Sequence, residues 1–310
     1  MQRCLLSLLF FSITHFAKAN NDSDTLAILG RWDITIRGGE TELPSWLEIH
    51  TSGFKHLVGE FVGPGGSARP VSIINFENGK LSFSIPPQWE SENSNLVFEA
   101  SLQADSLVGN ITFPNGKIWK CSAVKAPTLI RNKKPVWGNP IALFNGKDLK
   151  GWHASGSNNQ WVAENGILRS PKPGSNIISN ESFTDFKLHV EFRYAANGNS
   201  GVYLRGRYEV QIMDYAKDAP PKDVLGSIYG FIKPNEVVIT KPGEWVSYDI
   251  TLIGRNVTIV VNGKTTVCNQ EIPGITGGAL NSREGEPGPI MLQGDHEPIE
   301  YRKIIITPAK

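Results

Sequence analysis

Short runs of alternating apolar and polar residues, closed by Asn-Gly dipeptides, recur along this chain and constrain its fold more than any other feature. Examples lie at Asn78-Gly79, Asn165-Gly166 and Asn262-Gly263. Asn-Gly is the strongest short-range signal for a β-hairpin, because both residues accept the positive φ that a tight turn needs. Sustained apolar spacing of the helical kind, at i, i+3, i+4 and i+7, is hard to find. The pattern predicts a protein that is nearly all β.

The first 19 residues have the pattern of a secretory signal peptide. Arg3 supplies the positive end, Leu5–Phe16 the apolar run, and Ala17-Lys18-Ala19 the small residues of a cleavage site. No later stretch reaches the roughly 20 apolar residues of a membrane span, and Cys4 lies too early for a lipoprotein cleavage site. We therefore expect an exported protein, periplasmic or extracellular, without a membrane anchor.

Charge and cysteine content exclude several other classes. Lys and Arg number 31 against 30 Asp and Glu, so no basic footprint for nucleic acid or an anionic membrane is present. After cleavage only Cys121 and Cys268 remain, in different predicted domains and without the spacing of a zinc site. Two buried free thiols are the preferred interpretation, and a disulfide between them is the alternative.

The first predicted domain covers residues 20–128 and contains only strand signals. About eight short strands joined by tight turns indicate an up-and-down barrel or a sandwich. They are expected at Trp32–Ile36, Ser45–His50, Lys55–Val62, Ser67–Phe76, Lys80–Ile85, Asn95–Gln103, Ser106–Phe113 and Lys117–Val124.

Tryptophans mark this first domain, but we assign it no catalysis. The opening Gly30-Arg31-Trp32 resembles the start of lipocalin-like barrels, in which the Trp closes one end. Trp46 and Trp89 are expected to pack at the barrel rim, with stacking on a sugar ring as the alternative. A proline-containing linker with a basic cluster follows at residues 129–139.

The second predicted domain, residues 140–310, suits a jelly roll. Its strands alternate clearly, as in Phe186–Tyr194, where His189 and Glu191 lie on the polar face. Roughly 170 residues of antiparallel strands fit a two-sheet sandwich whose inner sheet can carry a binding cleft. The fold class predicted for the chain is therefore all-β, with a jelly-roll sandwich after a smaller β-barrel.

The stretch at residues 200–214 is the centre of the second domain. Tyr208, Val210 and Ile212 alternate with Glu209 and Gln211, so the first three are expected to be buried and the other two to share a polar face.

Three neighbours are expected to join that polar face. Asp214 reaches it if one residue after Gln211 is bulged, as is common beside active sites. Tyr203 and Arg205 come from the preceding strand.

Six motifs of the second domain, taken in order, resemble the 3-keto-disaccharide hydrolase domain family. They begin with Leu143-Phe-Asn-Gly-Lys-Asp-Leu-Lys-Gly-Trp152, Asp185-Phe-x-Leu-x-x-Glu-Phe-Arg193 and Asn199-Ser-Gly-Val-Tyr-Leu-Arg205, and continue with Tyr208-Glu-Val-Gln-Ile-Met-Asp214, Gly243-Glu-Trp245 and Gly288-Pro-Ile-x-Leu-Gln-Gly-Asp-His296. One departure is Tyr301-Arg-Lys303, where members usually carry Phe-Arg-Asn. The first domain looks like a lipocalin-like partner of such domains.

The resemblance implies a concanavalin-like jelly roll that acts on glycosides oxidised at C3 of the sugar. A ketone at C3 acidifies the hydrogen on C2, because the resulting carbanion is an enolate. A base removes this proton and the aglycone leaves from C1 by β-elimination, after which water can add to give net hydrolysis. The reaction needs a base, donors at the enolate oxygen and an acid for the leaving group. A partner oxidoreductase would supply the keto sugar.

Four residues are predicted to carry the chemistry. Glu209 and His296 are the candidates for the base, with the choice between them open; Asp214 is a second carboxylate, and Arg205 would stabilise the enolate. Residues predicted to bind or orient the substrate are Gln211, Glu191, Tyr203, Tyr229, Gln293, Asp295 and Trp152.

A metal ion and two other functions stay open at this point. Glu209, Asp214, Asp295 and His296 could together hold a divalent cation, and a structural Ca²⁺ is a second hypothesis; the motifs call for no other cofactor. The spacing Glu209-x-Gln-x-x-Asp214 also suits a retaining glycoside hydrolase, which needs carboxyl groups about 5 Å apart. A non-catalytic sugar-binding module is the other alternative to an enzyme that cleaves 3-keto-glycosides.

Overall fold

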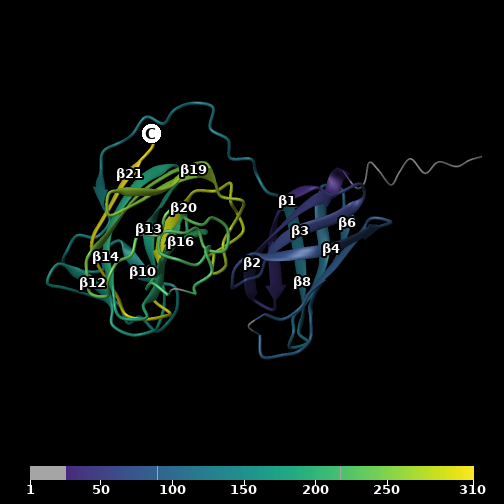
Figure 1. The fold of residues 1–310 in the computed structure, drawn as a ribbon, viewed down its shortest axis with the longest axis horizontal. Coiled ribbons are helices and arrows are strands. Elements are labelled where there is room, and N and C mark those ends of the chain that lie inside the picture. The colour runs from purple at the N-terminus through teal and green to yellow at the C-terminus, as the bar shows by residue number, and fades with distance from the viewer. Residues whose placement is uncertain (1–25, 89, 217) are drawn as a thin grey trace, which may run out of the picture.

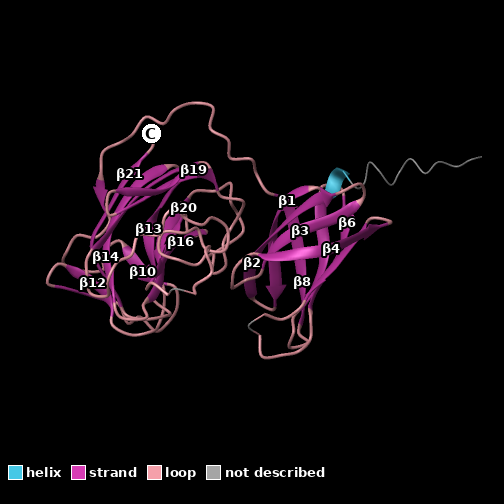
Figure 2. Cartoon of the chain, in the orientation of Figure 1, coloured by secondary structure: helices cyan, strands magenta, loops and turns pink. Residues whose placement is uncertain are grey.

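A computed structural model describes residues 26–88, 90–216 and 218–310. Nearly all of the regular structure is strand, and one short helical turn lies at residues 26–28 (Figure 2). The two parts are a closed barrel and a sandwich of two sheets (Figure 1). The predicted fold class is therefore confirmed. Within the described ranges no helix is long and apolar enough to cross a membrane, and the predicted signal peptide at residues 1–19 lies outside them.

The barrel consists of eight antiparallel strands in chain order, and it closes because the first strand pairs with both the second and the last. Each strand predicted from the sequence is present. The strands are β1 (Gly30–Gly38), β2 (Thr41–Ser52), β3 (His56–Val62), β4 (Arg69–Glu77), β5 (Lys80–Ile85), β6 (Leu96–Gln103), β7 (Ser106–Thr112) and β8 (Ile118–Lys125).

Trp32 fills the end of the barrel where the chain enters, as its Gly-x-Trp context indicates. Its side chain is fully buried, and the indole Nε1 donates a hydrogen bond of 2.8 Å to the carbonyl of Ile28 in the helical turn. The Lys125 ammonium lies 4.0 Å from the centre of the indole ring, a cation–π arrangement. The barrel is thus closed at this end, and its other end carries the loops after β1, β3, β5 and β7.

The two remaining cysteines are both free thiols. Cys121 is buried in the barrel core, which raises the pKa of its thiol to about 12. Cys268 is exposed on the sandwich, so the prediction of two buried thiols was wrong for this residue.

The sandwich packs a five-stranded sheet against a larger one (Figure 1). The smaller sheet has the order β10-β13-β20-β15-β16 and the larger one β11-β12-β21-β14-β17-β18-β19, with β9 paired to β21. Their bounds are β9 (Ile141–Ala142), β10 (Trp152–Ala154), β11 (Val162–Glu164), β12 (Ile167–Ser170), β13 (Ile177–Phe183), β14 (Phe186–Tyr194), β15 (Asn199–Leu204), β16 (Tyr208–Met213), β17 (Val246–Ile253), β18 (Asn256–Val261), β19 (Lys264–Glu271), β20 (Gly288–Leu292) and β21 (Ile299–Pro308).

The core of the sandwich comes from the predicted alternation. On β14 the apolar residues Phe186, Leu188, Val190 and Phe192 are buried, and on β16 Tyr208, Val210 and Ile212 face the same cluster. The opposite face of β16 is left for polar side chains, because successive residues of a strand point to opposite sides.

The segment between the two parts lies along the sandwich. Arg131 pairs with Asp185 through Nε and Oδ2 at 2.7 Å, and the Gly138 amide donates to the carbonyl of Pro308 at 2.8 Å. Lys187 covers the ring of Trp137 at 4.8 Å. These contacts tie the connecting segment to strands β14 and β21.

The barrel docks on the sandwich through apolar side chains. Trp46 and Val62 of the barrel belong to the hydrophobic core of the sandwich and are fully buried. The Trp46 ring meets that of Phe231 edge-on, with centroids 5.3 Å apart and an interplanar angle of 85°. A Cβ on Gly274 would lie 2.2 Å from the Trp46 indole nitrogen. Trp46 therefore packs between the two parts, and the alternative of an exposed sugar-stacking platform is wrong for it; Trp89 lies outside the described residues.

A buried polar cluster lies in the same interface. Asp33 of β1 is only 4% exposed. Burial, and then the adjacent carboxylate of Glu284, raise the pKa of Asp33 to about 9. Glu284 is itself fully buried and accepts hydrogen bonds from Arg255 Nη2 at 2.5 Å and the Tyr208 hydroxyl at 2.6 Å. Asp33 is therefore neutral at pH 7.

The Asp33→Asn variant tests this assignment. A folded-state pKa near 9 against 3.8 in the unfolded chain means that the folded protein keeps a proton that the unfolded chain has lost. Wild-type stability should therefore fall as the pH rises from about 4 to about 9. Asparagine mimics the neutral acid and removes this loss, so Tm of the variant should exceed that of wild type by a margin that grows with pH, at about 2–4 °C per kcal/mol. Thermal unfolding at several pH values measures the margin, and a constant margin would contradict the assignment.

Candidate active site

A cavity of about 230 Å³ lies on the smaller sheet, where β15, β16 and the loop after β20 meet two glycine-containing loops. One of these loops belongs to the sandwich and the other to the barrel. The lining residues are Gly65, Gly66, Asn199, Tyr203, Glu209, Gln211, Met213, Asp223, Tyr229, Gly277, Gly278, Gln293, Asp295 and His296. Pockets for drug-sized ligands measure roughly 300–1,000 Å³, so this cavity has room for one sugar ring rather than a longer chain.

The register of β15 and β16 brings the central polar residues into the cavity. Tyr203 pairs with Glu209, and Gly201 with Gln211, without a bulge. A Cβ on Gly201 would lie 2.3 Å from Glu209 Oε1. The glycine of the Asn199-Ser-Gly sequence therefore leaves the space that the Glu209 carboxyl occupies.

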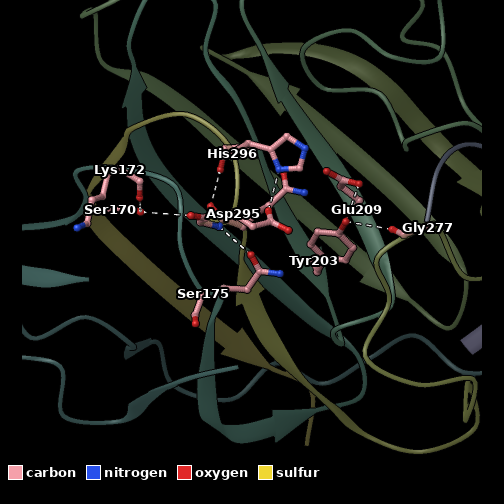
Figure 3. Close-up of polar contacts among 12 residues, drawn as sticks. Ser170, Lys172, Ser175, Tyr203, Glu209, Gly277, Asp295 and His296 are labelled. Atoms are coloured by element: carbon pink, nitrogen blue, oxygen red, sulfur yellow. Dashed lines mark hydrogen bonds and ion pairs between the residues drawn. The ribbon is translucent and has the colours of Figure 1, made fainter. Parts of the chain in front are cut away.

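Glu209 is the most perturbed acid of the cavity. It is 3% exposed, and burial raises its pKa to about 8 against the opposing effect of the Tyr203 hydroxyl, while Asp223 raises the pKa further. The Tyr203 hydroxyl lies 2.8 Å from Glu209 Oε2 and 3.0 Å from the carbonyl oxygen of Gly277 (Figure 3). At pH 7 most of the Glu209 carboxyl is protonated, and its ionised form is an unusually strong base for a glutamate.

His296 lies beside the same space, opposite Glu209 (Figure 3). Its Nδ1 is 2.8 Å from Asp295 Oδ1. The hydrogen bond to the Asp295 carboxylate raises the pKa of His296, although partial burial acts in the other direction. The adjacent carboxylate thus favours the protonated imidazole, which can donate to an oxygen of the bound sugar.

Amide side chains supply further polar groups in the cavity. Gln211 Nε2 donates to Asp223 Oδ1 at 2.5 Å, which leaves Gln211 Oε1 without a hydrogen-bond partner among the described residues. Gln293 Oε1 has no partner in this part of the chain either. Buried carbonyl oxygens of this kind are costly unless they accept a hydrogen bond, and the hydroxyl groups of a sugar are suitable donors.

Two polar residues that the sequence analysis did not select also line the cavity. Asp223 lies in the loop after β16, outside any alternating strand, so no periodic signal identifies it. Asn199 stands at the start of a quoted motif and begins strand β15, and its place in that motif was the available signal.

Arg205 does not reach the cavity. It sits in the turn between β15 and β16 with φ of +53° and is fully buried. Its guanidinium donates to the carbonyl of Glu284 at 3.3 Å, the carbonyl of Gly254 at 3.2 Å and the Tyr208 hydroxyl at 2.8 Å. The prediction that it stabilises an enolate is therefore corrected: turn geometry sends this side chain into the interface cluster.

Asp214 also lies outside the cavity, because the expected bulge after Gln211 is absent. The strand β16 continues regularly to Met213, and it is Met213 that lines the cavity. The Asp214 carboxylate instead accepts a hydrogen bond from the Asn197 amide at 2.8 Å. It therefore caps a turn beyond the strand.

Two predicted substrate-binding residues are placed elsewhere. Glu191 projects from the outer face of β14, where it contacts His189 and pairs with Arg302. Trp152 is buried in the sandwich core and donates from Nε1 to the carbonyl of Leu143 at 2.8 Å. Neither side chain faces the cleft. Glu191 lies on the outer face of the larger sheet, and Trp152 of β10 points into the core between the two sheets.

The residues suggested for a metal ion do not converge as a set, since Asp214 lies outside the cavity. Among the described residues no group of three or more His, Cys, Asp or Glu side chains is arranged to hold a metal ion.

The comparisons with known proteins agree with the sequence motifs. A model of the 3-keto-alpha-glucoside-1,2-lyase-like domain matches residues 139–307, more than half of the chain. The chain belongs to this family. The resemblance inferred from the motifs is thereby confirmed.

Individual relatives of the 3-keto-alpha-glucoside-1,2-lyase-like domain cover parts of the chain. A curated 3-keto-disaccharide hydrolase of Bacteroides thetaiotaomicron is 29% identical over 101 residues, 29% of this chain and 33% of its own, so the chain spans about a third of that relative. A crystal structure of a candidate glycosyl hydrolase from Parabacteroides distasonis is 32% identical, covers 54% of this chain and 82% of its own, and has a TM-score of 0.47. A second structure from that organism is 25% identical, with 55% and 98% covered and a TM-score of 0.46.

The barrel completes one wall of the cleft in this member of the family. Gly65 and Gly66 line the cavity, the Gly278 amide donates to the carbonyl of Pro64 at 3.0 Å, and a Cβ on Gly277 would lie 2.2 Å from the Gly66 oxygen. The two backbones therefore meet without intervening side chains. Because the family model covers only the sandwich, this wall lies outside the matched domain.

The Tyr203→Phe variant tests how the cavity controls Glu209. The tyrosine hydroxyl lowers the pKa of Glu209 against the effect of burial, so its removal should raise that pKa above 8, by about 1 unit for one hydrogen bond. Carboxyl titration followed by NMR with labelled glutamate measures the shift. Tyr229→Phe, which removes a hydroxyl from the same cavity, is the matched control and should leave the pKa of Glu209 within about 0.3 unit. An unchanged pKa in Tyr203→Phe would refute the role of this hydroxyl.

Proposed function

We propose that this protein cleaves glycosides that carry a ketone at C3 of the sugar, by removal of the C2 proton and β-elimination of the C1 substituent. The observation that carries the proposal is that Glu209 and His296 line the same cavity, which has the size of one sugar ring. The family match supports the substrate class. The 3-keto-disaccharide hydrolase that resembles this chain supports it further.

In the proposed first step the ionised Glu209 carboxylate takes the proton from C2. The electron pair of the broken C–H bond moves towards C3, and the ketone becomes an enolate. A pKa near 8 suits this task, because a base is most effective when its pKa lies near the working pH. Burial is what confers this basicity.

In the second step the enolate re-forms the ketone, a double bond forms between C1 and C2, and the bond from C1 to the leaving oxygen breaks. That oxygen takes a proton from the His296 imidazolium, which the Asp295 carboxylate stabilises. Addition of water across C1 and C2 then completes a net hydrolysis, whereas release without water makes the protein a lyase.

Neutral donors would stabilise the enolate oxygen in place of Arg205. The Tyr229 hydroxyl and the side-chain amide groups of Asn199 and Gln293 all line the cavity. Burial raises the pKa of Tyr229 to about 12, so this hydroxyl keeps its proton at the working pH. Donors fixed in place before the reaction stabilise a developing charge most effectively.

Three parts of the proposal concern the surroundings of the protein. We infer export to the periplasm or beyond, a separate oxidoreductase that makes the keto sugar, and no nucleic-acid partner. A divalent cation is kept as a hypothesis, and a chelator in the assay tests it.

The decisive experiment compares a 3-keto-glucoside that carries a chromogenic leaving group with the same glucoside unoxidised. Release is expected from the keto form alone. Glu209→Gln should lower kcat/KM by a factor of roughly 10²–10⁴, since glutamine cannot take a proton. Glu191→Gln removes a carboxylate from the outer face of the larger sheet, away from the cavity, and should leave kcat/KM unchanged.

The pH profile separates the two assignments of the base. If Glu209 is the base, kcat/KM rises with pH through about 8 as the carboxyl ionises. If Glu209 is the acid and His296 the base, kcat/KM falls through the same range instead. Release from the unoxidised glucoside would replace the proposal by a classical glycosidase. Sugar binding without any release would favour a binding module.

A further inference from the structure

A second cavity opens at the loop end of the barrel, and no step proposed so far uses it. Its volume is about 410 Å³, and it lies at the end opposite Trp32. The lining residues come from the loops after β3, β5 and β7 and from the strand ends beside them: Leu43, Gly63, Pro64, Gly65, Gly66, Arg69, Glu90, Glu92, Leu96, Phe113, Pro114, Asn115, Lys117 and Trp119.

This barrel cavity adjoins the cleft of Glu209. Gly65 and Gly66 line both cavities, so these two residues, which have no side chains, form the wall that the cavities share. The position of this loop is fixed, because it packs against Gly277 and Gly278 of the sandwich. A group that extends from C1 of a sugar in the cleft towards the barrel meets the second cavity next.

The walls of the barrel cavity combine an aromatic surface with a polar rim. Trp119 and Phe113 meet edge-on, with ring centroids 5.7 Å apart and an interplanar angle of 77°. The Trp119 ring lies directly against the backbone of Gly38, where a Cβ would come within 2.3 Å of it, so its position is set by a glycine.

The rim carries charged and amide groups. Arg69 and Glu90 form an ion pair of 2.9 Å, and Asn115 and Lys117 are exposed in the loop after β7. An apolar ring face beside hydrogen-bonding groups is the surface that a sugar ring requires, since its C–H face stacks and its hydroxyls bond.

We propose that the barrel cavity is the subsite for the leaving group, and that this leaving group is a second sugar ring. The inference rests on the proposed function, because it assigns the C1 substituent of the same substrate. The cleft holds the oxidised ring, and the barrel cavity holds the ring that departs. The barrel domain thus selects disaccharides over glycosides with small aglycones.

The test compares full-length variants on three substrates: a 3-keto-disaccharide, methyl 3-keto-glucoside and nitrophenyl 3-keto-glucoside. The measured quantity is the kcat/KM for the disaccharide divided by that for the methyl glycoside. Trp119→Ala should lower this ratio about tenfold, and the exposed Lys117→Ala about fivefold. Ile118→Ala removes an exposed apolar side chain from the outer face of the same strand and should leave the ratio unchanged.

The outcomes separate the inference from the proposed function. An unchanged ratio in both Trp119→Ala and Lys117→Ala overturns the subsite, and Lys117→Ala decides alone if Trp119→Ala does not fold. If Trp119→Ala and Lys117→Ala lower kcat/KM for the nitrophenyl substrate alone, the cavity binds an aryl group instead of a sugar ring. That result overturns the assignment made here.

If wild type turns over none of the three substrates, the proposed function fails instead. Calorimetric titration with an unoxidised disaccharide then tests the subsite without catalysis. Weaker binding in Trp119→Ala but not in Ile118→Ala supports the subsite, and equal binding in all three proteins overturns it.

Discussion

The contact between two backbones, the loop at Gly65-Gly66 and the loop at Gly277-Gly278, is the constraint on which the rest of the cleft depends. The Gly277 carbonyl lies within hydrogen-bond distance of the Tyr203 hydroxyl, which also contacts Glu209. A chain of direct contacts therefore joins the barrel to the most perturbed carboxyl group of the sandwich. A side chain on Gly277 would push the loops apart, because its Cβ would lie 2.2 Å from the carbonyl oxygen of Gly66.

The interface and the cleft share one strand but use its two faces. Tyr208 points into the interior and donates to Glu284, beside Arg205, Arg255 and Asp33. Glu209, the next residue, points the other way into the cleft. The strand is thus held on one side by hydrogen bonds from Tyr208 to Glu284 and from Arg205 to Tyr208, within a buried charged cluster. On the other side it presents the Glu209 carboxyl to the cleft, where the Tyr203 hydroxyl is its hydrogen-bond partner. Burial acts on both sides, and it keeps both Asp33 and Glu209 protonated at pH 7.

Alternation and turn signals were sufficient for the fold, because both are local properties. Every barrel strand, and the opposite faces of Glu209 and Gln211 against Val210 and Ile212, followed from them. Two of the errors arose where the chain leaves a strand. Arg205 lies in a turn with positive φ, and Asp214 follows the last regular residue, so neither side chain obeys the period of two.

Contacts made by loops and glycines at the cleft were beyond the sequence altogether. Asp223, Gly65 and Gly66 enter the cleft from loops, and no periodic pattern marks which loops will meet. The role of Trp46 was likewise open, since a rim tryptophan and an interface tryptophan have the same local context. The function of Gly201 shows the same limit: the motif that contains it was recognised, but only the structure gives the space it leaves for Glu209.

The position of the Tyr203 hydroxyl has a consequence for the sequence of events in the cleft. This hydroxyl has one hydrogen and two acceptors within reach, Glu209 and the Gly277 carbonyl. While Glu209 is ionised the hydrogen is drawn to the carboxylate, and the Gly277 loop loses that bond. When Glu209 holds a proton it can donate to the tyrosine oxygen, and the tyrosine hydrogen returns to Gly277. The Gly277 loop, which contacts the barrel, therefore lacks this hydrogen bond before Glu209 takes up a proton and has it afterwards. The gain or loss of one proton at Glu209 is thus linked to a hydrogen bond at the domain boundary.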